Sequence, residues 1–510
     1  MKKYLYGAAI QGIQSFIFQT NELQDITGAS ELVDKICTKE FKAFYGIDGE
    51  DGLIIGAAGN IKYDFSNEND CKKAVREFPK KVMTMVPGVT ISQAVAVYDD
   101  TTNEHFEKAI DDIEKKLKAQ RNKSYQSLTL GLTGISRSRT TGLPLTVKIK
   151  KDKEVYFDDS TYAKRQHNKL ITLSNKSFYG KEPETNLESG KIAFDISDIT
   201  DKNDWIAIIH ADGNGLGKVV QKVGKNKADF KYFSEQLNMS TIRAANDAFK
   251  EVSSKFIVNG KIPIRPVVLG GDDMTAIIRG DLAIPYVRVF MEKFEYYTQQ
   301  FLGKERFRKY EDCPDKLTAC AGVAFIKSSY PFYYGYNLAE ELCTKAKKDA
   351  KDFAGENNVA PSCLMFHKVQ DSFVENYEAI AKRELLTKDG SSFMYGPYYV
   401  HNENRPVDRL TINELIEISE ALKDEDGNAI KSNIRQWLTL MHNNEKMASQ
   451  KLRRIESLYP RSKVVRKLTV SVKRDYGNNI KRDTYLAYDV LSYHSVMNQI
   501  TKGENNDEDD

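Results

Sequence analysis

The chain has 510 residues, of which 41% are hydrophobic and 29% charged, and its formal net charge is +3. This composition is typical of soluble globular domains, and the length predicts two to four of them. No apolar run approaches the roughly 20 residues of a membrane span. Six cysteines without CxxC spacing argue against a zinc ribbon or a disulfide framework. We therefore expect a cytoplasmic protein with free thiols and no membrane partner.

The first part of the chain alternates between strand-like and helix-like segments. In chain order, the pattern predicts a strand that begins at Tyr4, a helix over Ala29–Phe44, a hairpin over Gly52–Phe65, a helix over Cys71–Met85 with a break at Pro79, a strand over Val89–Tyr98 and a helix over Glu104–Ala119. Residues 121–203 contain Gly, Thr and Ser clusters without clear periodicity, so we expect an irregular linker or small insertion there.

The same order recurs in the middle of the chain. The pattern predicts a strand over Asp204–Gly217 that runs into a Gly-rich turn, a helix over Phe230–Phe256, a hairpin over Ile264–Ile278, a helix over Leu282–Phe301, a strand over Leu317–Ile326 and a Lys-rich helix over Leu338–Phe353. Both passages follow the β-α-β-β-α-β order of a ferredoxin-like domain, which indicates a structural duplication.

After about Val369 the pattern becomes mainly helical, interrupted by the strand-like "KLTVSVKRD". We therefore predict an α+β chain with a ferredoxin-like domain in residues 1–120, a linker or insertion in 121–203, a second ferredoxin-like domain in 204–369 and a helical C-terminal domain in 370–510. The stretch Lys446–Arg482 contains twelve Lys or Arg residues, and the chain ends in the acidic "ENNDEDD".

The predicted second hairpin carries two adjacent carboxylates, Asp272 and Asp273, in "PVVLGGDDMTAII". One interpretation is a solvated hairpin turn, since Gly and Asp are common turn residues. The other is a metal site, because hard cations such as Mg²⁺ take oxygen ligands and leave further positions to substrate phosphates. The first copy has Gln11 and "GAAGN" where the second has Asp212 and "GGDD". A purely structural turn does not obviously need that difference, which favours the metal site.

These motifs resemble a known family. "HADGNGLG", with Asp212, and "GGDD", Gly270–Asp273, are similar to the active palm of the large subunit of type III CRISPR effector complexes (Cmr-type). The N-terminal "GAAIQGIQSFIFQTNELQDITGASELV" resembles the first, degenerate palm of that family. GGDD alone is only moderately specific, because diguanylate cyclases carry a similar motif. Its pairing with a degenerate upstream palm is much more specific.

The resemblance implies a nucleotidyltransferase that converts ATP into a cyclic oligoadenylate. Two Mg²⁺ or Mn²⁺ ions on Asp212, Asp272 and Asp273 would support attack of a 3′-hydroxyl on an α-phosphate. It also implies a lysine on the triphosphate, at Lys347 in "LAEELCTKAKKDAK", although a solvated lysine is the alternative. The residues expected near the nucleotide are Gly213, Asn214, Gly215, Gly217, Gly270, Gly271 and Ser30.

The chain departs from the family pattern in several places. Asn214 stands where many members have a second aspartate, so metal binding is expected to be retained but altered. No His-Asp pair precedes the first palm and no cysteines lie between the palms, so we predict neither an HD nuclease domain nor zinc. The chain is also short for the family. The resemblance nevertheless implies antiviral defence in a multi-subunit complex, with guide RNA, target RNA and other effector subunits as partners.

Three further features each have more than one interpretation. His210 is expected to be a buried, hydrogen-bonded residue rather than a metal ligand. Ser30, in "GAS", is expected either to cap a helix N-terminus or to contact a second ATP. The stretch Lys446–Arg482 could bind RNA backbone, dock an acidic partner or form a solvated helix face.

Two other functions use the same residues. One is a scaffold that binds RNA without turnover, and the other is a stand-alone nucleotide cyclase or AMP-conjugating enzyme. The sequence leaves the product, its ring size and the need for target RNA open, since all of these chemistries use the same metal-bound palm.

Overall fold

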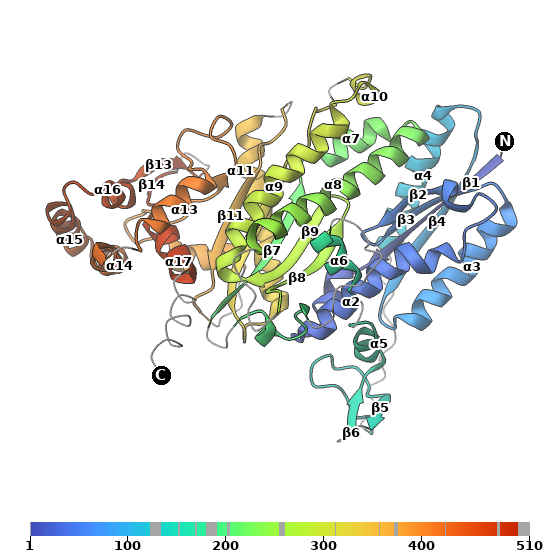
Figure 1. The fold of residues 1–510 in the computed structure, drawn as a ribbon, viewed down its shortest axis with the longest axis horizontal. Coiled ribbons are helices and arrows are strands. Elements are labelled where there is room, and N and C mark those ends of the chain that lie inside the picture. Colours follow the sequence, from blue (N-terminus) through green and yellow to red (C-terminus); the bar gives the residue numbers. More distant parts are fainter. Residues whose placement is uncertain are drawn as a thin grey trace. The chain divides into compact units, whose positions relative to one another are not determined.

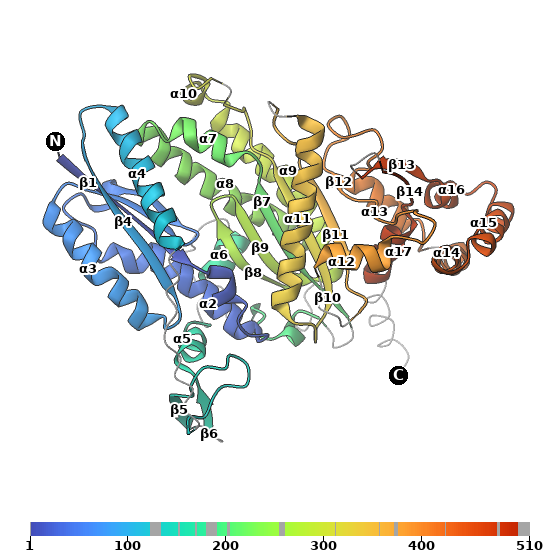
Figure 2. The same cartoon turned by 180° about the vertical axis from the view of Figure 1, so that it is seen from behind.

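The structure is a computed structural model, drawn in Figures 1 and 2, and it describes residues 2–122, 134–150, 154–168, 171–179, 191–200, 204–253, 261–311, 313–355, 358–371, 376–423, 425–476 and 480–497. By its internal contacts the chain divides into two compact units. The first comprises Met1–Ile199, Gly215–Ala276 and Lys293–Leu317, and the second comprises Thr200–Asn214, Ile277–Glu292 and Thr318–Asp510. The domain boundaries expected from the sequence remain a prediction.

The N-terminal sheet has four antiparallel strands in the order β2-β3-β1-β4. Its elements are β1 (Lys2–Gln11), α1 (Ile13–Ile17), α2 (Leu23–Lys35), β2 (Leu53–Ala57), β3 (Asn60–Phe65), α3 (Glu68–Met85), β4 (Thr90–Asp99) and α4 (Asn103–Arg121). This order is the ferredoxin-like arrangement, so the prediction for the first palm is confirmed.

The two faces of this sheet follow the alternation of side chains along β1. Leu5 belongs to a buried apolar cluster with α4, and a side chain at Gly7 would collide with Ile113 of that helix. Tyr6 points to the other face, where its ring stacks on Phe41 at 5.7 Å between centroids. Because both faces are covered, this palm has its own apolar core (Figure 2).

The predicted break at Pro79 is wrong, because α3 runs unbroken from Glu68 to Met85 with Pro79 inside it. A proline cannot donate a hydrogen bond to the carbonyl four residues earlier. That carbonyl belongs to Val75, and it accepts a hydrogen bond of 2.9 Å from Nε2 of Gln93 instead. The side chain on β4 thus satisfies the carbonyl that the proline leaves unbonded, which lowers the cost of the proline.

The segment expected to be an irregular linker contains regular elements in its described part. They are β5 (Val147–Lys150), β6 (Glu154–Phe157), α5 (Asp159–His167) and α6 (Thr172–Tyr179). Gly28 of α2 lets α5 approach closely, since a side chain there would collide with the carbonyl of Lys164. The buried ammonium of Lys164 bonds the carbonyl of Phe16 at 2.7 Å. These elements are short and polar, so their periodicity is too weak to read from the sequence.

The larger sheet has six strands in the order β12-β11-β10-β7-β9-β8. Its elements and those next to it in the chain are β7 (Trp205–Gly213), α7 (Leu216–Val223), α8 (Lys227–Ser253), β8 (Ile264–Gly270), β9 (Asp273–Arg279), α9 (Gly280–Leu302), α10 (Glu305–Arg308), β10 (Ala319–Lys327), α11 (Phe332–Ala354), β11 (Cys363–Lys368) and β12 (Tyr398–Tyr399). The order β10-β7-β9-β8 is again ferredoxin-like, which confirms the predicted duplication.

Within the second unit, α11 packs on β7, β10 and β11 (Figure 2). Gly322 of β10 permits this close approach, because a side chain there would lie 1.8 Å from the carbonyl oxygen of Ala339. Gly335 of α11 likewise faces Ile208 of β7 and Ile326 of β10. These two glycines fix the height of α11 above the sheet, and with it the position of the lysines on that helix.

The C-terminal part is mainly helical, as predicted. It contains α12 (Tyr377–Ile380), α13 (Ile412–Glu420), α14 (Glu425–Asn443), α15 (Glu445–Leu458), α16 (Lys463–Thr469), β13 (Val472–Asp475), β14 (Lys481–Thr484) and α17 (Ala487–Met497). The strand-like "KLTVSVKRD" includes β13, which pairs with β14. In the described part of the chain, no helix is long and apolar enough to cross a membrane.

Candidate metal and nucleotide site

The turn between β8 and β9 presents the GGDD sequence. Gly271 has φ of +64°, a left-handed conformation that residues with side chains rarely adopt, and the space where a side chain would project is open. Asp272 follows it in the turn, and Asp273 begins β9. The glycine is therefore required by the backbone, and it leaves the surface of the turn uncovered.

Two side chains of helix α8 form hydrogen bonds with the backbone of this turn. Oδ1 of Asn238 accepts a hydrogen bond of 3.3 Å from the backbone N–H of Gly271, and the hydroxyl of Thr241 donates one of 2.5 Å to the Gly271 carbonyl. Asn238 and Thr241 lie three residues apart, so both project from the same face of the helix. Together they fix both polar backbone groups of the glycine that precedes Asp272.

Asp212 is the penultimate residue of β7 and pairs with Cys320 of β10. Strand β7 is buried along nearly its whole length, while Asp212 itself is half-buried. In the sheet, β7 is the neighbour of β9. A carboxylate at the end of the buried β7 thus lies beside the strand that Asp273 begins.

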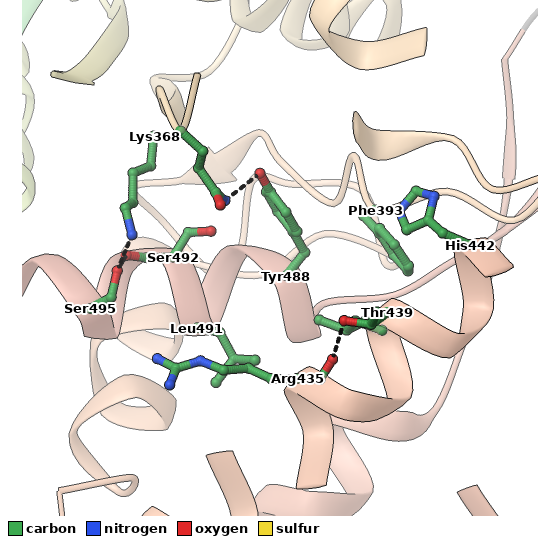
Figure 3. A pocket seen from close by; sticks show the side chains of 11 residues that line it. Lys368, Phe393, Arg435, Thr439, His442, Tyr488, Leu491, Ser492 and Ser495 are labelled. Carbon is green, nitrogen blue, oxygen red and sulfur yellow. Dashed lines mark hydrogen bonds between the residues drawn. The ribbon is translucent and has the colours of Figure 1, made fainter. Parts of the chain in front are cut away.

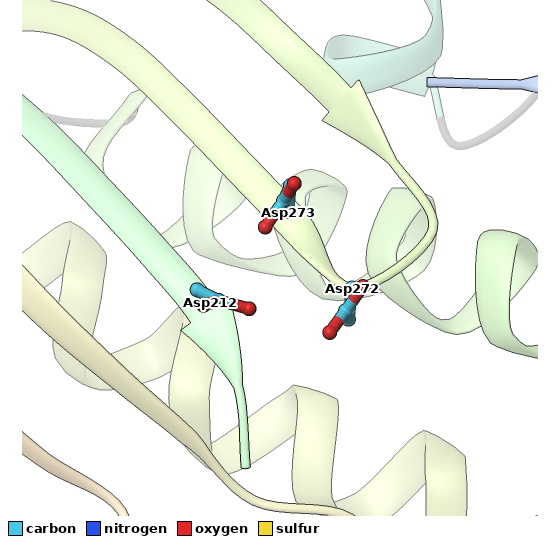
Figure 4. Close-up of side chains that lie close together, drawn as sticks. All are labelled: Asp212, Asp272 and Asp273. Carbon is cyan, nitrogen blue, oxygen red and sulfur yellow. The ribbon is translucent and has the colours of Figure 1, made fainter. Parts of the chain in front are cut away.

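The three carboxylates form one cluster, drawn in Figure 4. One ligand oxygen from each of Asp212, Asp272 and Asp273 lies within 4.8 Å of the others, and all three residues are half-buried. Like charges at this spacing repel each other, which a bound cation relieves. Carboxylate oxygens are the ligands that Mg²⁺ and Mn²⁺ prefer. The donor set therefore fits a hard divalent cation.

Lys347 is on α11 and reaches this cluster. Its ammonium forms an ion pair with Asp212 and donates a hydrogen bond of 2.9 Å to the carbonyl of Gly213. Burial disfavours the charged ammonium, but attraction and hydrogen bonding to Asp212 outweigh it, so the pKa of Lys347 is raised. The lysine therefore remains charged, at the carboxylate predicted to bind metal.

The segment after Asp212 combines a buried amide with open backbone. Asn214 is buried, and its Nδ2 donates to the hydroxyl of Thr318 at 3.1 Å and to Sγ of Cys320 at 3.2 Å. Gly215 has φ of +73°, and side chains at Gly215 or Gly217 would meet nothing within 4 Å. Asn214 thus stabilises the end of β7, whereas the glycines leave the approach to the start of α7 open.

His210 is buried, as predicted, and its ring meets Tyr336 edge to face at 5.6 Å between centroids. Burial lowers the pKa of His210 to about 4, with Asp212 acting against the shift and Lys347 with it. At neutral pH the ring is therefore neutral. His210 therefore packs as a neutral, buried side chain two residues before Asp212.

The helix-cap prediction for Ser30 is wrong. Helix α2 begins at Leu23, so Ser30 lies in its interior. The buried Ser30 hydroxyl hydrogen-bonds the carbonyl of Val267 in β8. The same strand continues to Gly270, whose surroundings include Ala58 in the β2–β3 turn. Ser30 therefore ties the first palm to the strand that leads into GGDD, and contact with a nucleotide remains a prediction.

Sequence reasoning missed Asn238 and Thr241. Their signal is present in the sequence only weakly, as two polar residues three positions apart on the inner face of the helix predicted over Phe230–Phe256. Such a pair is ordinary in a long helix. Only the structure shows that both contact Gly271.

Residues 205–355 match the family model of the second palm domain of Cas10/Cmr2. This segment is similar to a Cas10/Cmr2-type palm domain. The family resemblance expected from the sequence is thereby confirmed for the palm that carries Asp212, Asp272 and Asp273. No curated protein matches the chain in sequence.

Solved structures of Csm1 have a similar fold over most of the chain. The Csm1–Csm4 cassette in complex with cA4 is 12% identical with a TM-score of 0.55, covering 97% of this chain and 70% of that chain. Csm1 from T. onnurineus is 12% identical with a TM-score of 0.56, and the match again covers 97% of this chain and 70% of that chain. The Csm1–Csm4 cassette in complex with one ATP is also 12% identical, with a TM-score of 0.56, and the match covers 97% of this chain and 70% of that chain. At this identity the likeness establishes the fold.

Proposed function

We propose that this chain is the large subunit of a type III CRISPR effector complex and converts ATP into a cyclic oligoadenylate. The observation that carries the proposal is the cluster of Asp212, Asp272 and Asp273 at the tip of a Cas10/Cmr2-type palm. Structures with the same fold were obtained in complex with AMPPNP, pppApA, cA3 and cA4. In the proposed reaction these ligands would correspond to a substrate analogue, a linear intermediate and cyclic products.

In the proposed reaction, the 3′-hydroxyl of one ATP attacks the α-phosphorus of another. A phosphodiester bond forms and pyrophosphate leaves. Asp212, Asp272 and Asp273 would hold two Mg²⁺ or Mn²⁺ ions, which would lower the pKa of the hydroxyl and neutralise charge on the phosphates. Repeated transfer followed by closure of the ring gives the cyclic product.

The remaining residues bind and orient the nucleotide. Lys347 places a charged ammonium beside Asp212, where it can also contact the phosphate oxygens of a nucleotide bound through metal ions at that carboxylate. Gly215, Gly217 and Gly271 have open space where side chains would project, so phosphates or a sugar can approach the backbone there. The anchored GGDD turn keeps the carboxylates in place during the transfer.

The test is turnover of labelled ATP with Mg²⁺ or Mn²⁺, without RNA and with matched guide and target RNA, with products resolved by mass. We expect the double variant Asp272→Asn/Asp273→Asn to lose at least about a thousandfold in rate while its unfolding midpoint is unchanged or raised, since the variant removes charge repulsion. Product that depends on RNA would support the effector subunit.

The matched control is Asp111→Asn/Asp112→Asn, an adjacent aspartate pair on the outer part of α4. Asp112 forms an ion pair with Lys116 one turn away on an accessible surface, so the control should keep full activity. Product without RNA would favour a stand-alone cyclase. RNA binding without any product would favour the scaffold, and full activity of the Asp272/Asp273 variant would refute the metal assignment.

A further inference from the structure

The second unit contains a cavity of about 330 Å³ that is separate from the carboxylate cluster. It is shown in Figure 3 and lies between the end of β11, helix α14 and helix α17. The residues that line it are Lys368, Gln370, Phe393, Arg435, Leu438, Thr439, His442, Tyr488, Leu491, Ser492 and Ser495. The volume falls in the range of small-molecule sites.

Positive charge in this cavity has no acidic counterpart among its described lining residues. Lys368 comes from β11 and Arg435 from α14, whereas no Asp or Glu is among the described residues that line the cavity. Lys368 donates a hydrogen bond of 2.6 Å to the hydroxyl of Ser495, a neutral partner. Within the described part of the chain, the guanidinium of Arg435 forms no ion pair or side-chain hydrogen bond.

The surroundings increase this positive field. Burial, together with the charges of Lys327 and Arg435, lowers the pKa of Lys368 to about 8. Burial and then Arg435 lower the pKa of Lys431, one turn away on α14. Cations gathered in this way repel one another and are destabilising as a group. An anion bound between them would relieve the repulsion.

The rest of the lining suits a phosphate group attached to a small organic body. The hydroxyls of Ser492 and Tyr488 add groups that can donate to phosphate oxygens, whereas the Thr439 hydroxyl donates to the Arg435 carbonyl at 3.0 Å. The lining also includes apolar groups, which are Leu438, Leu491 and the ring of Phe393, and this ring stacks parallel to Tyr488 at 6.1 Å between centroids. Several donors around three oxygens favour phosphate over carboxylate.

We propose that this cavity binds a small phosphate-bearing ligand, either a nucleotide or a polyphosphate, with Arg435 and Lys368 as its charged partners. The site is independent of the proposed ATP chemistry, because none of its residues belongs to the palm cluster. Binding at this position would connect β11 of the palm sheet with helices α14 and α17 of the C-terminal part.

The test is calorimetric titration of the full chain with pyrophosphate and with AMP in the presence of EDTA, so that the palm carboxylates hold no divalent ion. We expect saturable binding that Arg435→Gln weakens at least about tenfold, because one charge-assisted contact is lost. Arg435 is exposed, so this variant should fold normally. Tighter binding of AMP would assign a nucleotide, and tighter binding of pyrophosphate a polyphosphate.

The matched control is Arg76→Gln, an exposed arginine on α3 outside the cavity, which should leave the affinity unchanged. The chain ends in "ENNDEDD", a second source of anionic groups, so each titration is repeated on a variant with Asp507, Glu508, Asp509 and Asp510 changed to amides. The proposal is overturned if neither protein binds pyrophosphate or AMP, if Arg435→Gln binds as well as the unchanged chain, or if only an RNA oligonucleotide binds.

Discussion

At the scale of single residues, the ammonium of Lys347 has two partners in the carboxylate cluster and its surroundings. This ammonium is shared between the carboxylate of Asp212 and the carbonyl of Gly213. A side chain that only stabilised the helix would need neither contact. The geometry instead suits a group that pairs with Asp212 and with phosphate oxygens brought to the same place.

We therefore predict that Lys347→Met lowers the rate of ATP turnover about ten- to a hundredfold and raises the KM for ATP, since a phosphate contact is lost. Lys348→Met is the matched control, because Lys348 is the next residue on α11 and is exposed. Steady-state kinetics on both variants checks the prediction. Equal effects of the two substitutions would show that Lys347 acts only through the charge of the helix.

Asp489 is a second residue whose environment has a measurable consequence. It is buried at the start of α17, where it accepts hydrogen bonds from the Tyr398 hydroxyl at 2.7 Å and the Gly396 N–H at 3.2 Å. Burial raises its pKa to about 7, and these hydrogen bonds and Arg474 only partly oppose the shift. In the unfolded chain an aspartate titrates near pH 4.

Between about pH 4 and pH 7 the folded state therefore holds a proton that the unfolded state has lost. Stability falls as the pH rises through this window, by on the order of 4 kcal/mol at most, and is level above it. We predict that Asp489→Asn removes this loss, so that it is more stabilising relative to the unchanged chain at pH 8 than at pH 5. Urea unfolding at both pH values measures it, and an equal difference at both would contradict the assignment.

At the scale of elements, the GGDD hairpin depends on α8. Asn238 and Thr241 hold the N–H and the carbonyl of Gly271, the residue whose left-handed conformation turns the chain toward Asp272. Neither side chain belongs to the carboxylate cluster. We interpret them as positioning residues that keep the two aspartates at a fixed spacing.

We predict that Asn238→Ala and Thr241→Val each lower the maximal rate about tenfold and raise the concentration of Mg²⁺ needed for half-maximal activity, with little change in the KM for ATP. Thr241→Ser retains the hydroxyl and should restore both quantities. A purely structural role would lower the unfolding midpoint without shifting the Mg²⁺ dependence. That result would refute the positioning role.

The elements also show what the sequence could and could not predict. Both β-α-β-β-α-β passages were predictable, because strands and helices alternate with clear periodicity and Asp212 and GGDD follow buried strands. The start of α2 was not predictable, since a glycine such as Gly28 is unfavourable inside a helix. Only the structure shows that Gly28 is needed there for α2 to pack against the backbone of Lys164 in α5. The break predicted at Pro79 is wrong for a similar reason. The carbonyl that Pro79 leaves unbonded accepts a hydrogen bond from Gln93, which is distant in sequence.

The same limit applies to the site. Three carboxylates on a strand end and a hairpin can be brought together by topology alone, so their clustering was predictable. The partner of Lys347 and the anchoring of Gly271 depend on how helices α11 and α8 pack on their strands. Helix packing is set by tertiary contacts such as those of Gly322, which local sequence does not encode.

At the scale of the whole molecule, charge is distributed unevenly although the net charge is only +3. The stretch Lys446–Arg482 is not uniformly available to a partner. Arg474 is buried, where it pairs with Asp408 at 3.0 Å, and Lys451 bonds Asn433 and Gln436 of α14. The exposed members are Lys446, Arg453, Arg454, Arg461, Lys463, Arg466, Lys467, Lys473 and Lys481.

These exposed residues fit the proposed contact with RNA, because neutralising phosphates releases counterions and makes binding depend on salt. For a single-stranded RNA, each phosphate contact contributes about 0.7 to the slope of log affinity against log salt. Arg466 and Lys467 are neighbours on α16, and both are exposed. If both contact phosphates, the variant Arg466→Gln/Lys467→Gln should lower that slope by about 1.4.

Fluorescence anisotropy with a labelled RNA between 50 and 200 mM salt, concentrations at which such contacts change affinity by orders of magnitude, measures the slope. Lys72→Gln/Lys73→Gln is the matched control, an adjacent exposed pair on α3. Both variants change the net charge by the same amount, so a general electrostatic effect would lower affinity equally. A change in slope confined to the α16 variant would place RNA on the C-terminal helices. Equal salt slopes for the two variants would indicate that α16 contacts a protein partner or solvent and not RNA.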